Sequence, residues 1–125
     1  MFLLDSNILI YAALPEHTFL RKLIEEEESK ASAITKVEVL GYHKLDEKSK
    51  NLFEEFFEAT QLIPVTSAII DRTVVLRQQK KMSLGDAIIA ATALEHELIL
   101  LSRNTADFQH IEHLELVDPF RDQTE

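Results

Sequence analysis

The sequence predicts an α/β fold in which a mainly parallel central sheet is flanked by helices. Short apolar runs, rich in leucine and β-branched residues, alternate along the chain with longer segments whose apolar residues recur at helical spacing. This alternation is typical of β–α–β units, which place parallel strands side by side. Only two glycines and three prolines occur in the 125 residues, which leaves no room for a flexible linker. We therefore expect residues 1–125 to form a single domain.

The individual elements follow from the same two patterns. Short apolar runs are assigned as strands, and segments with apolar residues three and four positions apart are assigned as helices. Thr66 or Ser67 is expected to cap one late helix and Ser83 the next, whose nearly all-apolar sequence predicts burial. In chain order, the predicted elements are a strand at 2–4, helices at 8–13 and 17–29, a strand at 31–34, a helix from 35, a helix at 46–60, a strand at 62–65, helices at 67–81 and 83–96, and strands at 98–102 and 114–117.

Composition limits the location and the partners of the protein. Cysteine is absent, which excludes disulfides and thiolate metal sites. The first residues lack a basic segment followed by a long apolar run, and residues 87–94 are far short of the ~20 needed to span a bilayer. We therefore expect a cytoplasmic protein without a membrane partner. A net charge of −9 argues against bulk attraction to nucleic acid but allows an enzyme that reaches phosphate through cations.

Four acidic residues are predicted to meet at one edge of the sheet. Asp5 ends the first strand, Glu38 lies within a turn of the second, and Asp107 follows the fourth. Asp86 opens the helix that leads into the fourth strand and reaches the same edge if that helix runs antiparallel to the strands. Ligands of parallel sheets bind beyond the carboxyl ends of the strands, so these four residues are the candidate site.

Each acid also has a purely structural explanation. Glu38 and Asp86 follow Thr35 and Ser83 at the spacing of a capping box. Asp5 would suit a helix cap, and the fourth acid would suit a turn. Several carboxylates at one edge, however, repel one another and raise one another's pKa unless a cation neutralises them. The four acids together therefore favour a metal site.

The residue types indicate which metal would bind. Oxygen ligands without cysteine or clustered histidine favour Mg²⁺ or Mn²⁺ over zinc. Such ions polarise a phosphodiester and lower the pKa of a bound water. Ser6, Asn7 and Asn104 are expected to support the site by orienting ligands or holding metal-bound waters.

The acidic residues lie within four distinctive segments of the chain. The segments are FLLDSNILI at 2–10, ITKVE at 34–38, LGDAIIAATA at 84–93 and LSRNTADF at 101–108. These segments resemble the signature blocks of PIN domains, and most of all those of the VapC toxins of bacterial toxin–antitoxin pairs. A single Asp-x-Asn motif would be weak, but the four blocks occur in order and at the right intervals over essentially the whole chain.

The resemblance implies a three-layer fold and Mg²⁺- or Mn²⁺-dependent cleavage of RNA. By matched position, Asp5, Glu38 and Asp86 would be the core metal ligands. Asn104 and Asp107 would share the fourth, more variable acidic position. Because asparagine stands at the first of these two, the resemblance does not fix the number of metal ions.

The resemblance also implies partners. It implies an RNA substrate, a homodimer, and a cognate antitoxin that blocks the active site. The amino-terminal helices carry more apolar residues than one sheet face needs, so we expect part of this surface, with the helix at 67–81, to form a two-fold dimer. The alternative is that all of these residues belong to the core. They are Ile8, Ile10, Tyr11, Leu14, Phe19, Leu20 and Leu23.

Other function classes fit the sequence less well. A receiver-type signalling domain would need a phospho-accepting aspartate after the third strand, where residues 63–66 offer none. A phosphatase with an aspartyl nucleophile usually has a second acid two residues later, where Asn7 stands. A non-catalytic PIN-like module that binds metal or RNA is the remaining alternative. Such modules normally lose one acid, whereas this chain keeps four, so the sequence favours an endoribonuclease.

Overall fold

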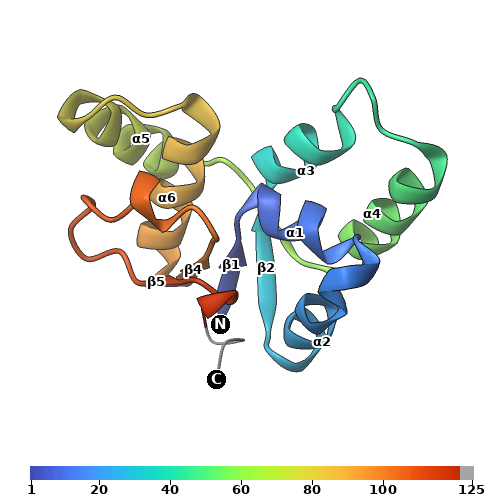
Figure 1. Cartoon of the computed structure of the whole chain (residues 1–125). Helices are drawn as coiled ribbons and strands as arrows, with labels where there is room; N and C mark the ends of the chain where they lie inside the picture. The colour runs from blue at the N-terminus through green and yellow to red at the C-terminus, as the bar shows by residue number, and fades with distance from the viewer. Residues whose placement is uncertain (122–125) are drawn as a thin grey trace.

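The computed structural model describes residues 1–121, which form a five-stranded sheet with helices on both faces (Figure 1). All four strand pairings are parallel, and the strand order is β3-β2-β1-β4-β5. The central strand β1 therefore lies where the order reverses, between β2 and β4. The strands are β1 (Phe2–Leu4), β2 (Ser29–Ser32), β3 (Leu62–Ile63), β4 (Ile99–Leu101) and β5 (Leu116–Val117).

Two groups of helices enclose the sheet. Helices α5 and α6 cover one face, and α1 to α4 cover the other (Figure 1). The helices are α1 (Ser6–Ala12), α2 (Thr18–Glu26), α3 (Ala33–Leu40), α4 (Glu47–Ala59), α5 (Ser67–Gln79) and α6 (Leu84–His96), with short 3-10 turns η1 (Pro15–His17) and η2 (Thr105–Asp107). No helix among residues 1–121 is long and apolar enough to cross a bilayer.

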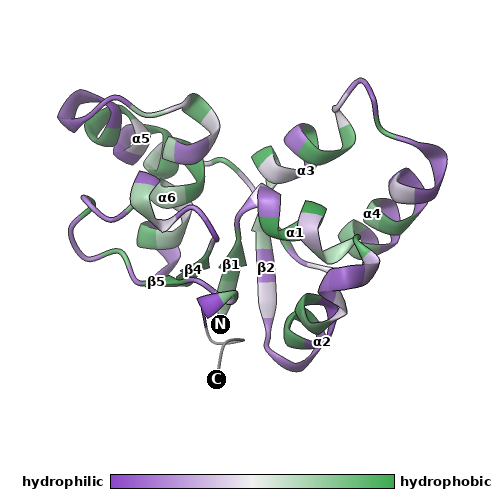
Figure 2. Cartoon of the chain, viewed as in Figure 1, coloured by the Kyte–Doolittle hydropathy of each residue, from purple (hydrophilic) through white to green (hydrophobic). Residues whose placement is uncertain are grey.

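The strand residues alternate between two hydrophobic cores. Leu3 and Leu100 pack into the core beneath α5 and α6, whereas Leu4 and Leu101 pack into the core beneath α1, α3 and α4. All four side chains are fully buried, as expected of strands covered on both faces. The hydrophobic colour of β1 and β4 in Figure 2 shows the same continuous apolar character. The predicted three-layer α/β fold with a parallel sheet is confirmed.

The predicted boundaries around β2 were wrong by two or three residues. Helix α2 ends at Glu26 rather than at Ser29, and β2 begins at Ser29. The run of glutamates at 25–28 explains the early end, because like charges repel and negative charge disfavours a helix carboxyl terminus. Helix α3 then begins at Ala33, where Ser32 Oγ accepts a hydrogen bond from the Ile34 N–H at 3.2 Å.

The buried helix α6 runs antiparallel to the strand that follows it. Glu97 ends the helix in a left-handed conformation, with φ of 52°, and the Leu98 N–H donates to Ala93 O at 2.9 Å. The chain then enters β4 directly. Since β4 is parallel to β1, α6 must begin at the carboxyl edge of the sheet, which is the condition that places Asp86 there.

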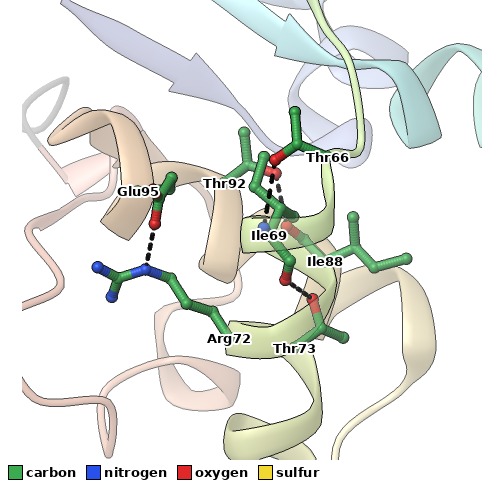
Figure 3. A network of polar contacts seen from close by, with 7 residues as sticks. All are labelled: Thr66, Ile69, Arg72, Thr73, Ile88, Thr92 and Glu95. Carbon is green, nitrogen blue, oxygen red and sulfur yellow. Dashed lines mark hydrogen bonds and ion pairs between the residues drawn. The ribbon is translucent and has the colours of Figure 1, made fainter.

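Polar groups between α5 and α6 are satisfied mostly within their own helices (Figure 3). Thr73 Oγ1 donates to Ile69 O at 2.8 Å, and Thr92 Oγ1 donates to Ile88 O at 2.7 Å. Arg72 forms an ion pair with Glu95 across the two helices. Helix α5 stops at Gln79, two residues before the predicted end, and Lys80 adopts an extended conformation.

Candidate functional site

Asp5 lies at the carboxyl end of the central strand β1, and its side chain is 3% exposed. It precedes α1 but forms no side-chain cap to that helix. Instead, Asp5 Oδ2 accepts a hydrogen bond from Ser102 Oγ at 2.8 Å. The helix-cap explanation of Asp5 is therefore wrong, and its carboxylate is held by a residue that is distant in the sequence.

Ser102 was missed by the sequence analysis as a site residue. It directly follows β4, is fully buried, and accepts a hydrogen bond from the Asn104 N–H at 3.0 Å. The pairing of Leu4 with Leu101 in the parallel ladder puts the next residue of each strand, Asp5 and Ser102, side by side. Because the Ser102 oxygen accepts a hydrogen bond from the Asn104 N–H, its own hydrogen is oriented toward the Asp5 carboxylate.

A second serine holds Glu38. Ser6, the first residue of α1, donates from Oγ to Glu38 Oε1 at 2.7 Å and lies 3.4 Å from Thr35 Oγ1. Ser6 was predicted to orient a carboxylate, and the structure places it where it does so. Thr35 does not cap α3; it is fully buried behind Ser6. The capping-box explanation of Glu38 is therefore wrong as well.

Gly85 in the first turn of α6 allows the Glu38 carboxylate to approach that helix. A Cβ atom at this position would lie 2.9 Å from Glu38 Cδ and would collide with one carboxylate oxygen. Any residue other than glycine would require Glu38 to move. The sequence analysis quoted Gly85 only as part of a motif, because its role depends on a contact between α3 and α6.

Asp86 combines a capping role with a place in the acidic cluster. Its backbone N–H donates to Ser83 Oγ at 3.2 Å, which is half of the predicted capping box. Burial raises the pKa of the Asp86 carboxyl, and the nearby carboxylates of Asp107 and Glu38 raise it further against the opposing hydrogen bond from Ser83. The capping role and the site role are therefore compatible at this residue.

Burial has a large effect on the pKa of the Asp5 carboxyl. Burial raises the pKa of Asp5 to about 6, with smaller contributions in the same direction from Asp86 and Glu38. The hydrogen bond from Ser102 opposes this rise by stabilising the charged form. The structure thus brings Asp5, Glu38 and Asp86 close enough to interact electrostatically, with Asp107 coupled to the set through Asp86.

The remaining predicted residues are less closely connected. Asp107 is exposed on η2, within electrostatic range of Asp86. Asn104 is also exposed, and it reaches the site through its backbone N–H to Ser102 rather than through its side chain. Asn7 is exposed on α1, and its side chain makes no hydrogen bond to the residues that the structure describes.

Residues 2–114, nearly the whole chain, match the PIN domain family. The chain belongs to the PIN domain family. The resemblance found in the four sequence blocks is thereby confirmed.

Several solved structures are similar to this PIN domain. A chain of a toxin–antitoxin complex from Klebsiella pneumoniae is 33% identical, with a TM-score of 0.78 over 95% of this chain and 98% of that chain. FitAcB from Neisseria gonorrhoeae is 24% identical, with a TM-score of 0.77 over 96% and 99%. VapBC2 from Rickettsia felis, bound to a DNA fragment from its promoter, is 20% identical, with a TM-score of 0.81 over 93% and 96%. The last two likenesses support the fold alone. No curated protein matches the sequence.

The donor set of this PIN domain fits a hard divalent cation. All candidate ligands are oxygen atoms, and burial together with mutual repulsion raises the pKa of Asp5 and Asp86, a cost that a cation would relieve. Among residues 1–121, no three acidic or histidine side chains lie close enough together to enclose an ion. The fit therefore rests on the chemistry and the coupling of the carboxylates rather than on a closed coordination shell.

Proposed function

We propose that this PIN domain is a Mg²⁺- or Mn²⁺-dependent endoribonuclease and the toxin of a toxin–antitoxin pair. Its metal ligands would be Asp5, Glu38, Asp86 and Asp107. The observation that carries the proposal is the packing at the carboxyl edge of β1 and β4, where Ser102 holds Asp5, Ser6 holds Glu38, and the Glu38 carboxylate lies against Gly85, the residue before Asp86. Neighbouring carboxylates repel one another, which costs free energy of folding. A divalent cation offsets this repulsion and can also bind a phosphodiester.

The serine hydroxyls prepare two of the ligands. Ser102 donates a hydrogen bond to Oδ2 of Asp5 and thereby stabilises its charged form. Ser6 donates to Oε1 of Glu38 and joins α1 to α3. Hydrogen bonds from supporting residues of this kind fix the orientation of metal ligands. Asn7 and Asn104 are proposed to contact metal-bound waters.

The chemistry would take place at the edge of the sheet. When bound, a divalent cation would polarise the phosphodiester and lower the pKa of an attacking water. Asp5 follows β1, and α3, α6 and η2 carry Glu38, Asp86 and Asp107, the residues that would hold such an ion.

An antitoxin partner is supported by the 33% identical chain from Klebsiella pneumoniae, whose structure is that of a toxin–antitoxin complex. The chain has an apolar groove of about 570 Å³ between α1, α2 and α4 that would accept an apolar segment of such a partner. Arg21 lies in this groove and donates to the carbonyls of Ala12 and Ala13 at the end of α1. The apolar residues that line it include Leu9, Ala12, Ile24, Phe53 and Phe56.

A homodimer is proposed on a smaller apolar surface than the sequence indicated. Of the amino-terminal residues, Ile8 and Leu20 are buried, and only Ile10 and Leu14 are substantially exposed. Helix α5 adds an exposed stripe in which Ile70 and Val74 are each 50% exposed. A second copy would cover this stripe. That residues 1–125 form a single domain and that the protein acts in the cytoplasm also remain predictions.

The nuclease proposal is tested by cleavage of RNA by the purified protein with Mn²⁺. Asp5→Asn and Glu38→Gln should each lower the cleavage rate by orders of magnitude. When several residues act jointly, replacing one of them costs nearly as much activity as replacing all of them. Circular dichroism and melting curves should show that both variants are folded. Undiminished cleavage in EDTA would refute metal dependence. Metal binding without cleavage of any RNA would favour the non-catalytic module.

A further inference from the structure

The guanidinium group of Arg103 lies over two aromatic rings next to the candidate site. Its guanidinium carbon lies 4.1 Å from the ring centroid of Phe120 and 5.1 Å from that of Tyr11. Both distances are within the range of cation–π interaction. Arg103 directly follows Ser102, the residue that holds Asp5. The stacked cation is therefore anchored at the carboxyl end of β4.

The rings beneath Arg103 are themselves held in place. Phe120 packs edge-to-face against Tyr11, His17 and Phe19, with centroid distances of 5.3, 5.1 and 5.4 Å. The turn that carries Phe120 is fixed by Asp118, whose Oδ1 accepts the Phe120 N–H at 2.9 Å. These contacts join residues 118–120 to α1, η1 and α2, so the platform under Arg103 is rigid.

Arg103 has no acidic partner among residues 1–121. Within residues 1–121, no carboxylate lies at ion-pair distance from Arg103, and no hydrogen bond uses its guanidinium group. The side chain is exposed. When a guanidinium stacks by its face, its N–H groups remain available at the edge, where they match two oxygens of a phosphate.

The position of this group follows from α1. Asn7 and Tyr11 are four residues apart on α1, so they lie on the same side of the helix, one turn from each other. Asn7 directly follows Ser6, which donates to the Glu38 carboxylate, whereas Tyr11 is under Arg103. An RNA strand that runs from the acidic cluster along α1 would therefore reach Arg103 after about one helical turn, which is ~6 Å along the helix axis.

We propose that Arg103, positioned by Tyr11 and Phe120, binds a phosphate of the RNA strand beside the acidic cluster. The inference rests on the proposed function, since it takes RNA as the substrate. It explains how a chain with a net charge of −9 holds a polyanion near its carboxylates: one oriented cation supplies a local contact that bulk charge does not.

The test separates binding from cleavage. A short, fluorescently labelled single-stranded RNA of mixed sequence is titrated with the Asp86→Asn protein over a series of salt concentrations. Adding Arg103→Met, which keeps the stacked stem and removes the charge, should weaken binding about tenfold. The slope of log affinity against log salt should fall by about 0.7, the value for one phosphate contact on a single strand.

Lys50→Ala is the matched control, because it removes one positive charge from the exposed Lys50–Glu54 pair on α4. It should leave both affinity and slope unchanged. Arg103→Lys should keep most of the salt slope but recover only part of the affinity, because an ammonium does not match phosphate with two parallel donors. Phe120→Leu should weaken RNA binding in a protein that still melts cooperatively.

Two outcomes would overturn the inference. One is an Arg103→Met protein that binds RNA as the Lys50→Ala protein does. The other is a Phe120→Leu protein with a lower melting temperature and unchanged RNA affinity, which would make the rings purely structural. The nuclease proposal fails separately: if wild-type protein binds RNA through Arg103 but cleaves none with Mn²⁺, the phosphate contact stands and the nuclease does not.

Discussion

Buried hydroxyl groups serve different purposes in two regions of the molecule. Between α5 and α6, Thr73 and Thr92 donate to carbonyls four residues earlier in the same helix (Figure 3). At the edge of the sheet, Ser102 and Ser6 donate to carboxylates that lie 97 and 32 residues away in the chain. The first kind of bond satisfies a hydroxyl inside a helix. The second kind orients an acid.

The difference indicates where this PIN domain is built for stability and where it is built for function. Removing a locally bonded hydroxyl leaves the helix ladder intact. Removing the Ser102 hydroxyl leaves the charge of the buried Asp5 with less compensation, which is costly in a buried site, whereas the exposed Glu38 would lose mainly its orientation without Ser6. The edge of the sheet should therefore respond to mutation through activity and pH dependence, whereas the α5–α6 layer should respond through stability alone.

The largest expected effect on folding is that of Asp5→Asn in the metal-free protein. The folded-state pKa of Asp5 is raised to about 6 from 3.8, so the folded state binds this proton more tightly than the unfolded state does. The stabilisation is complete below about pH 3.8 and is lost as the pH rises through 6. Above that pH, Asp5→Asn should be more stable than wild type by up to about 3 kcal/mol.

Urea unfolding in EDTA from pH 4 to pH 8 measures this gain. Asp46→Asn is the control, because the hydrogen bonds from Ser49 lower the pKa of Asp46 and give its charge the opposite effect. It should show no gain at neutral pH. Equal pH profiles for wild type and Asp5→Asn would mean that Asp5 is not a destabilised carboxylate, and the contrast between the regions would be lost.

A smaller effect is expected when only the hydroxyl is removed. Ser102→Ala should slow cleavage about 10- to 100-fold, as changes to residues that orient metal ligands typically do. The pH dependence of its cleavage rate should shift to higher pH, because the pKa of Asp5 rises further without this hydrogen bond. Thr92→Val removes a hydroxyl of the other kind and should change stability by about 1 kcal/mol or less while cleavage stays the same. Similar rates for the two variants would refute the distinction.

The smallest effect is expected from one methyl group. Gly85→Ala places a Cβ against the Glu38 carboxylate, which must move, so cleavage should fall several-fold. Stability should hold or rise by up to about 1 kcal/mol, because alanine favours a helix more than glycine does. Rates and melting temperatures of the purified variant measure both effects. Lower stability with normal cleavage would show that Gly85 serves packing and not the position of Glu38.

The parts of the fold that the sequence predicts are those set by local pattern. The apolar runs of β1, β4 and α6 and the cap at Ser83 are evident in the residues themselves. The start of α3 was misplaced because Ser32 and Thr35 can both cap a helix, and only the burial of Thr35 against Ser6 decides between them. Strands β3 and β5 have two residues each, shorter than predicted, because their apolar runs extend beyond the paired residues.

The candidate site was predictable in its acids and not in the residues that hold them. The rule that ligands bind at the carboxyl ends of parallel strands selected four acids, Asp5, Glu38, Asp86 and Asp107. The role of Ser102 depends on the pairing of β1 with β4, and the role of Gly85 depends on the contact of α6 with α3. Both are contacts between distant segments, which a single sequence does not show.

The central claim, that the carboxylates at the edge of the sheet bind a divalent cation, is tested most directly by melting curves with and without Mn²⁺. A ligand that binds only the folded state at 100 times its Kd adds about 2.7 kcal/mol of stability. Wild type and Asp46→Asn should therefore both melt at a higher temperature with Mn²⁺, whereas Asp86→Asn should lose most of that increase while being at least as stable as wild type without metal. An increase that Asp86→Asn leaves unchanged would contradict the account.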